Sequence, residues 1–289
     1  MHRNSAPGTP DDGEGWDLLV DEVGAPAVQP FVGLRDRPLR DQPGVDAPHG
    51  RFLAEGDAVV ARALAAGHRL LSLLVDARRE RALPDGVASA RSTGATVIGA
   101  GPGVIRAITG AGSHEGSLGL FARPSPMTVG RALHGLHTVV VAEGVVNPIN
   151  LGLIARSAVA MGAQALLVDP TSADPLYRRA TRVSMGEALA VPHARLEVLP
   201  GGLAPLREAG FAVWALTPAD DAEDISRVRV AADAKVALMV GAEGPGLTPA
   251  SQQAADVRVR IPVSGAVDSL NVGAAAAVAA YALGRARDR

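Results

Sequence analysis

The second half of the chain alternates between short apolar runs and longer segments in which apolar residues recur every three or four positions. Short apolar runs are typical of buried strands, and the longer pattern is typical of helices. The expected strands are 138–142, 165–168, 212–216, 236–240 and 257–261, and the expected helices are 150–161, 176–184 and 272–285. This alternation predicts βαβ units and a mostly parallel sheet that is covered by helices on both faces.

A smaller set of elements precedes this region. Helices are expected at 57–66 and 102–109, and strands at 70–75, 96–98 and 117–122, which together predict a compact α/β domain over 31–123. We expect residues 1–30 to form a mobile tail, because the first of them are rich in proline, glycine and acidic residues. Residues 124–135 are expected to be a linker, since two prolines at its start disfavour regular structure. The remaining residues, 136–289, form the second predicted domain.

Composition narrows the classes of function. A net charge of −2 gives no overall signature of nucleic-acid binding, so any basic surface must be local. The chain has no cysteine, which excludes disulfides, thiolate nucleophiles and cysteine-ligated zinc. The histidines show no metal-ligand spacing, so we expect no metal. The N-terminus lacks the order of a signal peptide, and the apolar run 272–283 is shorter than the roughly 20 residues that span a bilayer. We therefore expect a cytoplasmic protein without membrane contact.

Three polar or glycine-rich segments follow predicted strands. They are EGVVNPIN at 143–150, GAEGPGL at 241–247 and IPVSGAVDSLN at 261–271. In open α/β sheets, ligands bind at the C-terminal ends of the strands. Each segment by itself is explained more simply by an ordinary turn or a helix cap. The order and spacing of all three together favour a shared binding site.

In this order the segments closely resemble the three signature motifs of the SpoU, or TrmH, family of RNA ribose methyltransferases in the SPOUT superfamily. The resemblance covers about 136–286 and rests on NLGLIAR at 150–156, VALMVGAEGPGL at 236–247 and IPVSGAVDSLNVGAAAAVAAYAL at 261–283. The segment RFLAEGDAVVARAL at 51–64 resembles, more loosely, an L30e-type substrate-binding domain. The implied fold is α/β, with a trefoil-knotted parallel-sheet domain after a smaller L30e-like domain. Only the family implies the knot, which is rare among folds.

The resemblance implies an enzyme that uses S-adenosyl-L-methionine to methylate a ribose 2′-hydroxyl in structured RNA. Its product would be S-adenosyl-L-homocysteine, it would need no metal, and the L30e-like domain favours rRNA over tRNA as the partner. Family members also suggest a homodimer formed through the C-terminal domain. Two alternatives stay open. One is a catalytically silent RNA-binding or ribosome-assembly protein on the same scaffold, and the other is a Rossmann-type nucleotide enzyme, which the absence of G-x-G-x-x-G after the first strand disfavours.

The resemblance also implies roles for individual residues. Backbone groups around four residues would hold the cofactor: Leu216, Gly241, Ile261 and Leu270. The catalytic centre would use Arg156, Asn150, Glu243, Ser269 and Asn271. A glycine at position 241 suits this arrangement, because without a Cβ the main chain can approach a ligand closely.

Arg156 matches the catalytic arginine of the family. Because arginine is almost always protonated, we expect it to grip the phosphate beside the target ribose, and action as a general base is the alternative. Asn147 stands where the family usually has an acidic residue, so it keeps the ability to form turns but lacks the negative charge.

Several arginines are candidates for RNA contact. Arg178, Arg179 and Arg182 lie within five residues of each other, and Arg51 opens the L30e-like segment. Phosphate contacts of this type usually supply affinity that does not depend on sequence. A solvated helix face explains the cluster equally well.

Overall fold

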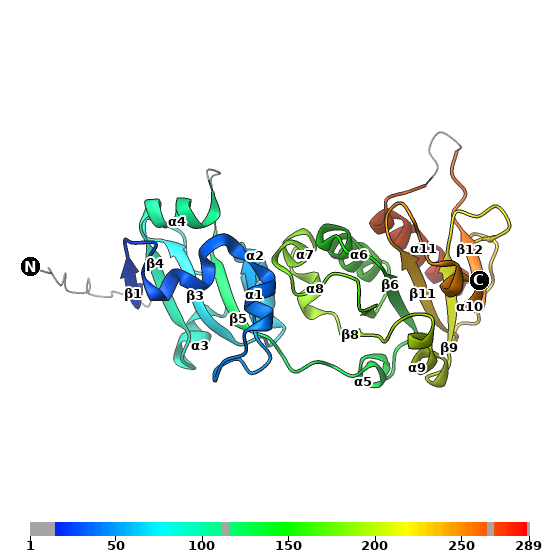
Figure 1. Cartoon of the computed structure of the whole chain (residues 1–289), viewed down its shortest axis with the longest axis horizontal. Helices are drawn as coiled ribbons and strands as arrows, with labels where there is room; N and C mark the ends of the chain where they lie inside the picture. The colour runs from blue at the N-terminus through cyan, green and yellow to red at the C-terminus, as the bar shows by residue number, and fades with distance from the viewer. Residues whose placement is uncertain (1–14, 111–115, 265–268, 288–289) are drawn as a thin grey trace, which may run out of the picture. The chain divides into compact units, whose positions relative to one another are not determined.

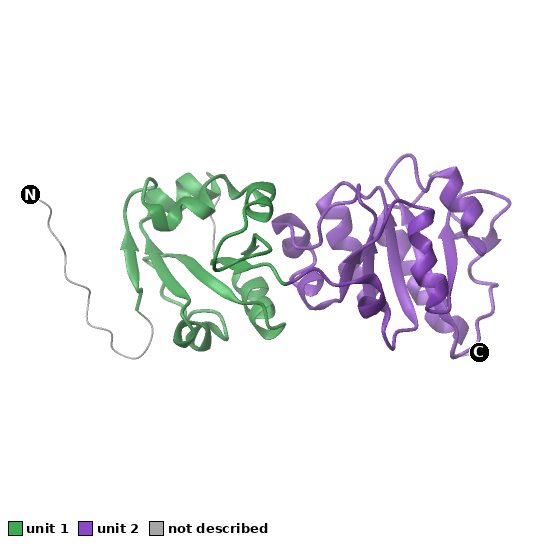
Figure 2. Ribbon diagram, turned by 60° about the horizontal axis from the view of Figure 1, so that its bottom comes forward, with its two compact units in different colours: residues 1–124 green, residues 125–289 purple. Residues whose placement is uncertain are grey.

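A computed structural model describes residues 15–110, 116–264 and 269–287. The chain divides into two compact units, and the boundary lies between Pro124 and Ser125 (Figure 2). Each unit has its own sheet and its own hydrophobic core.

The first unit contains a five-stranded mixed sheet in the part of the chain that the structure describes, with the order β1-β4-β3-β5-β2. Its strands are β1 (Leu18–Val20), β2 (Arg51–Glu55), β3 (Leu70–Asp76), β4 (Thr96–Ala100) and β5 (Leu118–Ala122). Its helical segments are η1 (Pro26–Leu34), α1 (Asp36–Asp41), α2 (Asp57–Ala65), α3 (Val87–Ser92) and α4 (Pro102–Thr109). Strands β1, β3 and β4 are parallel, whereas β5 is antiparallel to both β2 and β3.

The first unit begins earlier than the sequence suggested. We expected residues 1–30 to be a tail, but β1 pairs with β4, and η1 buries Val28 and Phe31 completely. Just before β1, the carboxylate of Asp17 accepts a hydrogen bond of 2.7 Å from the backbone N–H of Val97. The prediction was wrong for the described part of the tail, because a three-residue strand and an irregular 3-10 segment have no detectable periodicity.

The second unit is built on a parallel sheet, as predicted. Within the described residues the sheet has seven strands in the order β10-β12-β9-β11-β6-β7-β8, and every neighbouring pair is parallel. The strands are β6 (Thr138–Glu143), β7 (Ala165–Val168), β8 (His193–Arg195), β9 (Phe211–Leu216), β10 (Glu223–Asp224), β11 (Lys235–Gly241) and β12 (Val257–Arg260).

Helices cover both faces of this sheet (Figure 1). The core on one face includes side chains of α6 (Pro148–Ala160), α8 (Glu187–Ala190) and α11 (Val272–Arg287), and α7 (Arg178–Val183) packs against α6. The core on the other face includes side chains of α5 (Val129–Leu133), η2 (Gly201–Leu203), α9 (Ala204–Glu208) and α10 (Pro249–Ala254). None of the helices in the described residues is long and apolar enough to cross a bilayer.

Helix α5 corrects another expectation. Residues 124–135 were expected to be a linker, but the Thr128 side chain accepts a hydrogen bond from the backbone N–H of Arg131 and caps a short helix. Ala132 and Leu133 of this helix are buried in the core of the second unit. Only the first part of the segment, with its prolines, lacks regular structure, because a helix can begin as soon as a capping residue is available.

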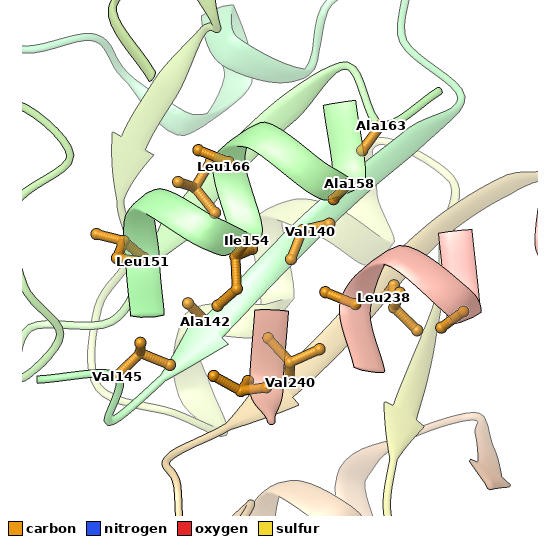
Figure 3. Packing of buried hydrophobic residues seen from close by; sticks show 14 of the residues in the cluster. Val140, Ala142, Val145, Leu151, Ile154, Ala158, Ala163, Leu166, Leu238 and Val240 are labelled. Carbon is orange, nitrogen blue, oxygen red and sulfur yellow. The ribbon is translucent and has the colours of Figure 1, made fainter. Parts of the chain in front are cut away.

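The packing of α6 on the sheet positions the first motif. Leu151 and Ile154 of α6 are completely buried in the core, and Ile154 points toward Ala142 of β6 (Figure 3). Burial of such side chains stabilises the fold by about 1.5–3 kcal/mol each. This packing fixes the first turn of α6 at the C-terminal end of β6.

Helix α11 crosses α6 at close range. A Cβ on Gly273 would lie 2.6 Å from the Cβ of Leu153, a separation that real Cβ atoms do not tolerate. The glycine therefore allows α11 to approach α6, which brings the third motif beside the first.

The C-terminal end of α11 is anchored by one side chain. Arg287 donates hydrogen bonds to the backbone oxygens of His137 (3.0 Å) and Ala234 (2.8 Å), and also to the hydroxyl of Thr138. We predict that Arg287→Met lowers the free energy of unfolding by about 1–3 kcal/mol, because three acceptors lose their donor. Urea titration measures this value. An unchanged midpoint would show that the anchor contributes nothing.

Candidate functional site

The second and third motif loops line one cavity, at the C-terminal ends of β9, β11 and β12. The cavity has a volume of about 540 Å³. All four residues predicted to hold a cofactor line it, together with three of the predicted catalytic residues: Leu216, Gly241, Ile261, Leu270, Glu243, Ser269 and Asn271. The structure therefore brings together residues that are up to 55 positions apart in the sequence.

Asn150 joins the three motifs. It lies buried in the first turn of α6, and its Nδ2 donates a hydrogen bond of 2.8 Å to Glu243 Oε2. Its Oδ1 accepts a hydrogen bond of 3.2 Å from Nδ2 of Asn271. Asn271 in turn accepts a hydrogen bond of 2.9 Å from the backbone N–H of Gly273 and so caps the start of α11. A single buried amide thus sets the position of two side chains that line the cavity.

Gly241 is needed for the shape of the second loop itself. The loop turns back on β11, where the backbone N–H of Gly246 donates to the oxygen of Ala242 at 2.9 Å. A Cβ on Gly241 would lie only 2.2 Å from backbone atoms of both Gly246 and Leu247. Close approach of a ligand was the reason expected from the sequence, and closure of the loop is a second reason that only the structure reveals.

Arg156 follows Asn150 on the same helix, α6, and its side chain is exposed. It is not among the residues that line the cavity, and with the described residues it makes no hydrogen bond or ion pair. Its five N–H donors are therefore available for a partner from outside the chain.

The arginine cluster is carried by the neighbouring helix. Arg179 and Arg182 of α7 are exposed, and Arg178 is half-buried. Helices α6 and α7 pack closely, since a Cβ on Gly152 would lie 2.5 Å from the backbone oxygen of Ala180. The cluster and Arg156 therefore sit on two helices in direct contact. Arg51, at the start of β2, belongs to the first unit.

A model of the SpoU rRNA Methylase family matches residues 137–281. The chain belongs to this family. The match runs from β6 into α11 and includes all three motif loops, so the predicted family of RNA methyltransferases is confirmed.

Two curated relatives extend the likeness beyond the SpoU segment. An uncharacterized tRNA/rRNA methyltransferase of Mycobacterium tuberculosis is 42% identical, over 82% of this chain and 82% of the relative. A 23S rRNA (guanosine-2′-O-)-methyltransferase of Ralstonia nicotianae, RlmB, is 32% identical over 73% of this chain and 85% of its own. Among solved structures, the AdoMet-bound rRNA methyltransferase of Sinorhizobium meliloti superposes with a TM-score of 0.76 at 27% identity, covering 92% of this chain and 97% of that one.

This SpoU chain departs from the usual motif at Asn147, and the structure shows what the side chain does. Asn147 Oδ1 accepts a hydrogen bond of 3.0 Å from the backbone N–H of Ile149 and caps α6. Neutral asparagine caps a helix as well as aspartate does. The start of α6 therefore does not require the negative charge.

Two buried carboxylates that support the SpoU loops were missed by the sequence reasoning. The first, Glu143, ends β6 and accepts hydrogen bonds from the backbone N–H of Thr248 (2.9 Å), its hydroxyl (3.0 Å) and the hydroxyl of Ser251 (2.5 Å). It therefore holds the start of α10, directly after the second loop. The only indication of this role in the sequence was the position of Glu143 at the end of a predicted strand. Its hydrogen-bond partners lie more than 100 residues away, so no local pattern links them.

The second carboxylate, Asp169, follows β7 and holds the first loop. It accepts hydrogen bonds from the backbone N–H groups of Gly144 (3.1 Å) and Ser172 (2.8 Å) and from the Thr171 hydroxyl (2.6 Å). Burial acts to raise the pKa of Asp169, but these hydrogen bonds outweigh it and hold the pKa below its ordinary value of 3.8.

The lowered pKa of Asp169 predicts a pH-dependent contribution to stability. The contribution is complete above pH 3.8, the ordinary value, and is lost as the pH falls through the lower pKa of the folded state. We expect Asp169→Asn to lower the free energy of unfolding by about 1 kcal/mol at pH 7, and by progressively less under acid conditions. Urea titrations from pH 7 to pH 3 measure this, with Asp233→Asn, at an exposed carboxylate, as the control. A difference that does not change with pH would contradict the prediction.

Proposed function

We propose that this chain transfers the methyl group of S-adenosylmethionine to a ribose 2′-hydroxyl in structured RNA, with rRNA as the favoured substrate. The observation that carries the proposal is the hydrogen-bonded set Asn150, Glu243 and Asn271 at the cavity. It joins the three motifs on which the resemblance to ribose methyltransferases rests. The RlmB relative, whose name specifies guanosine-2′-O methylation of 23S rRNA, supports the same chemistry.

The cavity suits S-adenosylmethionine in size and lining. Its volume of about 540 Å³ lies in the range of small-molecule sites. Leu216, Val240 and Ile261 offer apolar surface to an adenine ring, and the lack of a side chain on Gly241 leaves backbone groups accessible. The bound cofactor would supply an electrophilic methyl group. The AdoMet-bound relative from Sinorhizobium meliloti supports this assignment.

The polar residues bind and orient the RNA substrate, each in a different way. Arg156 binds the phosphate beside the target ribose, because a guanidinium offers a fixed fork of donors for phosphate oxygens. Glu243, Ser269 and Asn271, which line the cavity, orient the ribose, and Asn150 positions two of them through its amide. Most of the rate enhancement then comes from holding the hydroxyl in line with the methyl group.

RNA binding extends beyond the cavity. Arg178, Arg179 and Arg182 contact phosphates beside Arg156, and the first unit serves as an L30e-like substrate-binding domain in which Arg51 is a further contact. We also propose that the second unit forms a trefoil knot, as the resemblance to the SpoU family implies.

A homodimer through the second unit completes the proposal. Helices α6 and α11 pack against each other, and each exposes large apolar side chains: Ile149 on α6, and Val278 and Tyr281 on α11. Tyr281 is 58% exposed, so we expect Tyr281→Glu to yield monomers in light-scattering measurements. Leu19→Glu, at a similarly exposed residue of the first unit, serves as the control. A wild-type protein that is monomeric and fully active at micromolar concentration would exclude the dimer.

The test of function compares ribose methylation at every rRNA and tRNA position in cells with and without this gene. We expect one or a few ribose methylations to disappear, and to return when the purified chain and S-adenosylmethionine are added to the unmodified RNA. Cofactor binding without any methylation would favour a catalytically silent RNA-binding protein. No affinity for S-adenosylhomocysteine in calorimetry would refute the proposal.

A further inference from the structure

Strand β12 carries two arginines with different surroundings. Arg258 and Arg260 lie two residues apart, so their side chains leave the same face of the sheet. The guanidinium of Arg258 pairs with Asp221. Arg260 lines the cavity, and its buried Nε has no hydrogen-bond partner among the described residues. Buried polar groups without a partner are rare and call for an explanation.

Asp224 attracts Arg260 through its charge, but no hydrogen bond or salt bridge joins the two side chains. Asp224 lies opposite Arg260 in the β10–β12 pair, but its carboxylate accepts hydrogen bonds from the backbone N–H (2.9 Å) and hydroxyl (2.7 Å) of Ser226. Asp224 also lies 3.8 Å from the guanidinium of Arg227. Its principal partners are thus other groups.

The cavity itself contains one positive charge and two negative charges. Of the described residues that line it, Arg260 alone is cationic, whereas Asp220 and Glu243 are acidic. Glu243 already accepts a hydrogen bond from Asn150. An anionic group on a ligand would therefore be repelled by two of these side chains and attracted by Arg260 alone.

We propose that Arg260 binds the α-carboxylate of the methionyl part of S-adenosylmethionine. This inference rests on the proposed function, because it assigns one end of the cofactor to one side of the cavity. A carboxylate accepts two parallel hydrogen bonds from a guanidinium, and such charged bonds are stronger than neutral ones. The contact gives the buried Nε or its neighbouring amines a partner and directs the amino-acid part of the cofactor toward β12.

The proposal predicts that the chain binds a ligand with the α-carboxylate more tightly than a similar ligand without it. S-adenosylhomocysteine carries it, whereas 5′-methylthioadenosine has the same adenosine and thioether without the amino-acid part. Titration calorimetry on the full chain compares both ligands with wild type, Arg260→Met and Arg260→Lys. Arg258→Met is the matched control on the same strand, because its partner Asp221 does not line the cavity.

We expect wild type to bind S-adenosylhomocysteine at least about tenfold more tightly than 5′-methylthioadenosine, since a charged hydrogen-bond pair is usually worth that factor or more. Arg260→Met should weaken this preference several-fold and keep its affinity for 5′-methylthioadenosine. Arg260→Lys should keep part of the preference because it retains the charge. Arg258→Met should leave the ratio of the two affinities unchanged.

Two results would overturn the assignment of Arg260. One is an unchanged preference in Arg260→Met, and the other is an equal loss of affinity for both ligands, which indicates a structural role. Either result would leave the proposed function standing as long as wild type binds S-adenosylhomocysteine. If wild type binds neither ligand, the proposed function fails together with the inference. Thermal unfolding of each variant verifies that the fold is intact.

Discussion

Arg156→Ala is expected to reduce methyl transfer at least about a hundredfold, because loss of a positioning contact at the reacting centre removes this much rate or more. The fold should be unaffected, since Arg156 is exposed and makes no hydrogen bond or ion pair with the described residues. Substitutions at such surface positions usually change stability by less than about 0.5 kcal/mol. Affinity for S-adenosylhomocysteine should also stay within about twofold of wild type, because the residue does not line the cavity. Transfer of labelled methyl groups to unmodified RNA, calorimetry and thermal unfolding measure the three quantities.

Two further variants test the cause of the expected loss of activity in Arg156→Ala. Arg131→Ala changes an exposed arginine on α5 and should keep full activity, which controls for a general loss of positive charge. Arg156→Lys separates the two roles considered for the residue. A lysine that grips phosphate restores part of the activity without changing its pH dependence, whereas a lysine that acts as a base makes the rate rise with pH as its ammonium deprotonates. Full activity in Arg156→Ala would exclude both roles.

Gly241→Ala is expected to damage both the cavity and the fold. The new methyl group would lie 2.2 Å from backbone atoms of Gly246 and Leu247, so the second loop must move away from β11. Forcing extra atoms into a closely packed site usually costs about 1–3 kcal/mol. Because Glu243 lies in the displaced loop, affinity for S-adenosylhomocysteine should fall at least about tenfold. Urea titration and calorimetry test the two effects separately.

Gly284→Ala is the matched control for this substitution. Gly284 lies in α11, and a Cβ there would meet nothing within 4 Å. Alanine favours helix by about 0.8–1.0 kcal/mol relative to glycine, so the control should be neutral or slightly more stable. If Gly241→Ala behaves like this control, the close approach between β11 and its loop has no energetic role.

Much of the second unit could be predicted from the sequence because its strands are apolar runs of ordinary length. The expected strand 236–240 is β11, and the expected helix 150–161 is α6 with a start two residues earlier. Short elements were missed, such as β8 with three residues and β10 with two, because so few residues contain no periodicity. In the first unit β2 was missed as well, since only Phe52 and Leu53 gave an apolar signal there.

The candidate site could be predicted as a set of residues but not as a set of contacts. The motif order pointed to Asn150, Glu243 and Asn271, yet nothing in the sequence indicated that Asn150 bonds to the other two. Glu143 and Asp169 were missed for a related reason. Most of their partners are backbone N–H groups and hydroxyls, which every loop contains, so no residue pattern reveals the pairing.

The distances in sequence between Asn150 and its partners affect when the cavity can exist. Glu243 is 93 residues after Asn150, and Asn271 is 121 residues after it. During synthesis, the growing chain lacks one wall of the cavity until α11 has left the ribosome. A chain truncated before α11 should therefore have no donor-binding pocket even when its sheet is formed.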